Sequence, residues 1–117
     1  MSSAPVIAVF FRVPMFVEGL RDALRGLGDV RAFPSPAGDP LRLLESLRPD
    51  AVIVDGERDA SAALAYAHEA RIPALYVPSE SSTLHRVARH GWEAVEGDPS
   101  PELIRNILEA ALQEVRV

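Results

Sequence analysis

The chain has 117 residues, enough for one domain with its own core, and its 48 % hydrophobic and 25 % charged residues are typical of a globular protein. It contains no cysteine and no lysine, so disulfides, thiolate metal sites, thiol nucleophiles and every lysine-dependent mechanism are excluded. The formal net charge of −5 disfavours binding to nucleic-acid phosphates, and the first residues carry neither a basic segment nor a long apolar run. We therefore expect a single cytoplasmic domain over residues 1–117, with no membrane segment.

The first part of the chain alternates predicted strands and helices. Residues 6–11 are an unbroken β-branched and aromatic run, which predicts a strand buried on both faces. A helix over 14–27 follows, because proline suits a first helical turn and apolar residues recur at helical spacing until a glycine. Residues 29–33 predict a short edge strand, and residues 41–47 a helix that ends before a proline.

The same alternation continues through the second part of the chain. Apolar runs predict buried strands at 51–54 and 72–77, with an alanine-rich helix at 60–70 between them. Residues 82–90 predict a short helix capped by serine, and 92–95 a last strand. A serine cap, a first-turn proline and a first-turn acid at residues 100–102 begin the final helix.

Five strand–helix alternations with short connections predict an α/β fold with a doubly wound parallel sheet and helices on both faces. At this size we expect five strands in the flavodoxin-like order 2-1-3-4-5. Ligands of such sheets bind beyond the carboxyl ends of the strands, where strands one and three diverge. The residues expected to line this crevice follow the ends of four strands and are Phe11, Arg12, Asp55, Glu57, Ser79 and Gly97.

Four segments in the same order along the chain, 11–24, 49–55, 72–77 and 98–103, resemble response-regulator receiver domains of the NarL/FixJ type. The resemblance implies a two-component signalling domain in which the aspartate at the end of the third strand accepts a phosphoryl group. That position is Asp55 here. On position alone, Asp55 could equally begin a turn with Gly56, and Arg12 could be a solvated loop residue. Glu57, Asp59 and Glu80 could line a shallow acidic pocket.

The sequence departs from the receiver pattern at the other chemical positions. The acid pair that holds Mg²⁺ in the resembled family matches Phe11 and Arg12. The switch serine or threonine after the fourth strand matches Pro78, with Ser79 one place later, and the lysine after the fifth strand matches Gly97.

These departures change the chemistry expected at Asp55. Phosphorylation of a carboxylate needs a hard cation, and Mg²⁺ in such sites is held by one or two carboxylates. Arg12 would instead place a fixed positive charge beside Asp55, within about 6 Å, and could pair with it bidentately. We therefore expect a pseudo-receiver that binds no metal or other cofactor and does not work as an enzyme.

Three interpretations of function follow. The leading one is a signalling or transcription-regulating module that acts by contact with a protein partner or with a second copy of the chain. Any contact with DNA is then expected to be made by a separate effector domain that this chain lacks. The second is a regulatory domain that binds a small acidic molecule in the crevice through Arg12. The third is a receiver that is phosphorylated on Asp55. No nucleophile elbow or dinucleotide fingerprint indicates a hydrolase or an oxidoreductase.

The final helix carries an apolar stripe wider than one sheet face needs. Together with the apolar start of the first helix, it predicts an exposed patch for self-association. The residues assigned to this interface are Leu103, Ile107, Leu112 and Val115.

Overall fold

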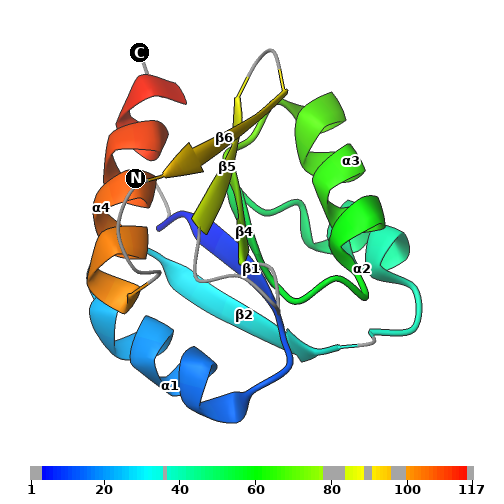
Figure 1. The fold of residues 1–117 in the computed structure, drawn as a ribbon, viewed down its shortest axis with the longest axis horizontal. Helices are drawn as coiled ribbons and strands as arrows, with labels where there is room; N and C mark the ends of the chain where they lie inside the picture. Colours follow the sequence, from blue (N-terminus) through cyan, green and yellow to red (C-terminus); the bar gives the residue numbers. More distant parts are fainter. Residues whose placement is uncertain (1–3, 36, 78–83, 89–90, 96–99, 116–117) are drawn as a thin grey trace.

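The computed structural model describes residues 4–35, 37–77, 84–88, 91–95 and 100–115, which form one mixed sheet with helices on both faces (Figure 1). The helices and strands, in chain order, are β1 (Val6–Phe11), α1 (Pro14–Ala23), β2 (Asp29–Pro34), α2 (Pro40–Leu47), β3 (Ala51–Asp55), α3 (Ala60–Ala70), β4 (Ala74–Val77), β5 (Leu84–Ala88), β6 (Gly91–Val95) and α4 (Pro101–Val115).

The sheet has the strand order β2-β1-β3-β4-β5-β6, and its first four strands are parallel. This part of the predicted order, 2-1-3-4, is confirmed. The register pairs Phe10 of β1 with Val54 of β3, so the two strands end almost level. The residues that follow β1 and end β3 are therefore brought together at the carboxyl edge of the sheet.

The helix predicted over residues 82–90 is wrong. Strand β5 occupies residues 84–88 of this stretch and pairs antiparallel with both β4 and β6. Residues 78–90 only just reach the dozen or so residues that a helical crossover between parallel strands requires. Two antiparallel strands need only a tight turn between them. The sheet is thus six-stranded and mixed, and the predicted five-stranded, all-parallel arrangement is not what the chain adopts.

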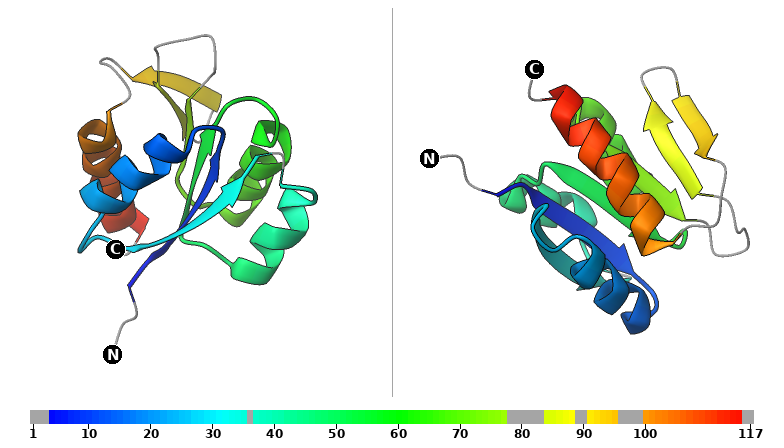
Figure 2. Two further views of the ribbon diagram at one scale, coloured as in Figure 1. Left: turned by 90° about the horizontal axis from the view of Figure 1, so that it is seen from below. Right: turned by 90° about the vertical axis from the view of Figure 1, so that its left-hand side faces the viewer.

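The core forms two layers, one on each face of the sheet. Helices α1 and α4 cover one face, and α2 and α3 cover the other (Figure 2). The side chains of Ile7 to Phe10 and of Ala51 to Val54 are fully buried, as expected for central strands with helices on both sides. Successive residues of β1 alternate between the two layers, with Ile7 in one and Ala8 in the other.

The apolar stripe of α4 is largely covered. Leu112 is 6 % exposed and packs in the same cluster as α1, so its assignment to an exposed interface is wrong. Leu103 and Ile107 are half-buried against that cluster, and the side chain of Val115 lies outside the described residues. The stripe is wide because α4 packs against α1 as well as against the sheet. The Arg105 guanidinium strengthens this contact by donating hydrogen bonds to the carbonyl oxygens of Ala23 and Arg25, at 2.7 and 3.0 Å.

Candidate functional site

An arginine and an aspartate meet where β1 and β3 end. Asp55 is the last residue of β3 and is 4 % exposed, whereas Arg12 directly follows β1. One carboxylate oxygen, Oδ2, accepts a hydrogen bond from the backbone N–H of Arg12 at 3.1 Å. The other, Oδ1, lies 3.2 Å from the guanidinium Nη2 of the same residue. The ion pair predicted from the sequence is therefore present.

The pair is not a bidentate guanidinium–carboxylate contact. Each oxygen of Asp55 accepts one hydrogen bond from Arg12. Oδ2 accepts from the backbone N–H, and Oδ1 accepts from the guanidinium. The side chain of Arg12 is 42 % exposed, so the guanidinium covers the carboxylate on one side and faces water on the other. A carboxylate buried to this extent requires such partners, because an unpaired buried charge is strongly destabilising.

Gly56 gives Arg12 the space that this contact needs. A Cβ atom at this position would lie 2.6 Å from Cδ and 2.8 Å from Nε of Arg12. The backbone also has a φ of +94°, in the region that favours glycine. The N–H of Gly56 donates to the carbonyl oxygen of Val77 at 2.9 Å, which ties the turn after β3 to β4. The sequence shows the Asp55–Gly56 turn but not the packing of Arg12 over its glycine.

A second buried carboxylate, Asp59, lies just before α3. It is 5 % exposed and accepts hydrogen bonds from the hydroxyl of Ser35 and from the backbone N–H of Ala37, the latter at 3.1 Å. These contacts hold the loop between β2 and α2 against the start of α3. Asp59 therefore does not line an open acidic pocket, and no sequence pattern indicates Ser35 as its partner.

Glu57 is exposed and interacts with Tyr76 of β4. Burial, the negative charge of Glu57 and a side-chain hydrogen bond with Glu57 together raise the pKa of the Tyr76 phenol above its usual value of 10.0. Tyr76 thus stays protonated, as a hydrogen-bond donor, throughout the physiological pH range.

The remaining predicted crevice residues do not join this cluster in the described part of the chain. Phe11 is half-buried and packs against the α1–α4 layer of the core. Ser79, Glu80 and Gly97, together with Pro78, lie outside the described residues. Among the residues that the structure describes, no group of three or more His, Asp and Glu side chains is arranged to hold a metal ion.

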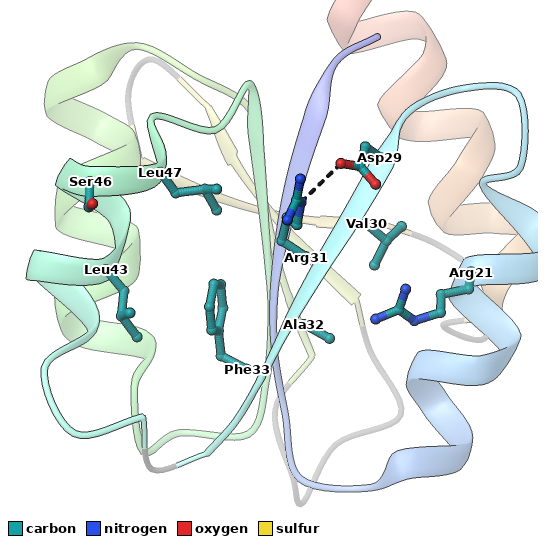
Figure 3. Close-up of a pocket in the computed structure, with 9 residues that line it drawn as sticks. All are labelled: Arg21, Asp29, Val30, Arg31, Ala32, Phe33, Leu43, Ser46 and Leu47. Atoms are coloured by element: carbon teal, nitrogen blue, oxygen red, sulfur yellow. Dashed lines mark hydrogen bonds and ion pairs between the residues drawn. The ribbon is translucent and has the colours of Figure 1, made fainter.

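A depression of about 610 Å³ lies elsewhere, at the outer edge of β2 (Figure 3). It is lined by Arg21 of α1, by residues 29–33 of β2, and by Leu43, Ser46 and Leu47 of α2. The sequence did not lead us to predict this depression, because only the crevice at the carboxyl ends of the strands was expected to bind a ligand. The signal available in the sequence was the short, charged edge strand itself.

Comparison of the chain with protein-family models, with curated proteins and with solved structures finds no match. No helix in the described residues is both long and apolar enough to cross a membrane. Function is therefore inferred from the residues and the geometry of this chain.

Proposed function

We propose that this domain is a regulatory module of the pseudo-receiver type, in which Arg12 takes the place of the metal ion and the domain acts by protein contact rather than by phosphoryl transfer. The observation that carries the proposal is the pairing of Arg12 with a carboxylate that is only 4 % exposed, at the ends of two neighbouring strands. This is the position of the phosphate acceptor in the receiver domains that the sequence resembles.

The geometry disfavours phosphorylation of Asp55 for two reasons. Asp55 is only 4 % exposed and the guanidinium of Arg12 lies against its carboxylate, so a phosphoryl donor has little access to either oxygen. A cation at this carboxylate would also lie next to the guanidinium. Two unit charges 4 Å apart near a protein surface repel by roughly 4 kcal/mol, and a divalent ion by about twice as much.

The strand order 2-1-3-4 supports a receiver-like origin for the first four strands. The antiparallel β5 is a departure from it, because a receiver has a helix between its fourth and fifth strands. A domain that has replaced both the metal-binding acids and this helix would not transmit a phosphorylation signal in the receiver manner. Constitutive contact with a partner protein is the function that this arrangement supports best.

Manganese binding tests the proposed role of Arg12. We expect no selective broadening of the amide NMR signals of Asp55 and Gly56 when Mn²⁺ is added to the natural protein, since the guanidinium excludes the ion. Arg12→Asp should create a two-carboxylate site and broaden both signals, and adding Asp55→Asn to that variant should abolish the effect. The matched control is Arg25→Asp, at an arginine whose side chain is 81 % exposed. Broadening at Asp55 in the natural protein would overturn the proposal.

A further inference from the structure

Strand β2 is at the end of the sheet and leaves hydrogen-bonding groups unpaired among the described residues. The N–H groups of Asp29 and Ser35 point toward β1: that of Asp29 donates to the carbonyl oxygen of Pro5, just before β1, at 2.7 Å, and that of Ser35 to the carbonyl oxygen of Phe11 at 2.8 Å. Because strand residues alternate in direction, Val30 and Ala32 direct their N–H and C=O groups away from β1. Pro34 alternates in the same way as Val30 and Ala32. Its lack of an N–H therefore costs no hydrogen bond to β1.

The depression at this edge has two chemically different sides (Figure 3). On the α2 side, Phe33, Leu43 and Leu47 offer an apolar wall beside Ser46 and the paired side chains of Arg31 and Asp29. On the α1 side, the side chain of Arg21 reaches toward Ala32 and Val30. A strand that paired with β2 would direct alternate side chains to these two sides.

The charge on the α1 side is uncompensated. Arg31 is paired with Asp29 of the same strand at 2.9 Å, so these two charges cancel. Arg21 has no ion-pair or hydrogen-bond partner in the part of the chain that the structure describes. The edge therefore carries a net positive charge in a chain whose formal charge is −5.

We propose that the free edge of β2 binds an extended acidic segment of a partner protein by β-strand addition, with its apolar side chains against α2 and its carboxylates toward Arg21. A second copy of this chain fits the edge less well. Two-fold pairing of β2 with itself would put both α1 helices on one face, with two Arg21 guanidinium groups close together. This surface is separate from Arg12 and Asp55, so it can fail its test while the proposed function stands.

The experiment uses a fluorescein-labelled peptide as long as β2, six residues of alternating glutamate and valine, and its counterpart of alternating lysine and valine. Fluorescence anisotropy should show saturable binding of the acidic peptide only, with the largest amide NMR shifts at Val30 and Ala32. Arg21→Glu should weaken binding of the acidic peptide at least about fivefold and favour the basic one. Arg25→Glu, a charge reversal outside the depression, should leave binding within about twofold of the natural protein.

Ala32→Pro tests the backbone contribution, because proline is tolerated at an edge where the N–H faces outward. With the fold verified by circular dichroism, it should weaken binding at least about tenfold, since one donor is lost and the added ring blocks the edge. Equal binding of the two peptides, no saturable binding, or unchanged binding after Arg21→Glu would overturn the proposal. So would a dimer in sedimentation that Ala32→Pro dissociates, because a second copy would then occupy the edge.

Discussion

Asp55 is held by one residue through two different groups, the backbone N–H and the guanidinium of Arg12. A substitution of the Arg12 side chain leaves the backbone hydrogen bond in place and removes the guanidinium with its charge, its hydrogen bond and its packing over Gly56. The contribution of the guanidinium can therefore be measured without exposing the carboxylate completely. Gly56 belongs to the same unit, because its missing side chain is what lets Arg12 lie over the turn.

Arg12→Ala should lower the free energy of unfolding by about 1–2 kcal/mol, because a hydrogen bond to a charged group contributes roughly 1.5–3 kcal/mol and the exposed guanidinium is partly screened. In an Asp55→Asn background the same substitution should lower the free energy of unfolding by less, because the amide carries no charge to pair with the guanidinium. Urea unfolding measures both values. Arg25→Ala, which removes a pair with Asp22 in which both side chains are exposed, is the matched control. An equal cost of Arg12→Ala in the two backgrounds would show that Arg12 does not act through Asp55.

The proximity of Arg12 and Asp55 was predictable from the sequence. Each residue lies at the end of a run of buried apolar residues, and two such runs had to become neighbouring central strands of a parallel sheet. The contact between Ser35 and Asp59 was not predictable in this way. It depends on the path of a loop, which hydrophobic periodicity does not determine.

Among the secondary-structure elements, β1, α3 and the parallel order of the first four strands followed from the sequence pattern, whereas β5 did not. The segment around β5 has a serine-rich start and a glycine after it, which suit a helix and a hairpin equally. A helix was predicted because strands and helices alternate strictly in the rest of the chain, and this prediction is wrong. At α4, the width of the apolar stripe could not show whether part of it is exposed or is covered by a second helix. Helix α1 packs against this stripe, and Leu112 is buried there.

Helices α2 and α3 both end in an arginine with left-handed backbone, Arg48 at a φ of 51° and Arg71 at 58°. Glycine is the residue that normally takes this position, because it has no Cβ to strain. Arg48→Gly and Arg71→Gly should each raise the free energy of unfolding by about 0.5–1 kcal/mol, the relieved strain being partly offset by the more flexible unfolded chain.

Urea unfolding compares these variants with Arg58→Gly, at an exposed arginine whose backbone is not left-handed. That control should bring no gain, because it has no strain to relieve and only adds entropy to the unfolded chain. Stabilisation by all three substitutions would show that the gain comes from removing positive charge rather than from the helix ends.

In the molecule as a whole, the two candidate surfaces belong to different parts of the sheet. Arg12 and Asp55 lie at the carboxyl end of its centre, and the depression beside β2 lies along its outer edge. In the proposed function, the first accounts for the loss of phosphoryl transfer and the second is the surface proposed for a partner. A domain that combines them would act through binding that is independent of phosphorylation.

Incubation with acetyl phosphate and Mg²⁺, followed by intact-mass spectrometry, tests the loss of phosphoryl transfer most directly. Because Asp55 is nearly buried and Arg12 holds a positive charge where the metal ion would be needed, we expect the mass of the protein to remain unchanged. Asp55→Asn, which removes the nucleophile, should give the same spectrum as the natural protein. A stoichiometric mass increase of one phosphoryl group in the natural protein, absent from Asp55→Asn, would contradict the account.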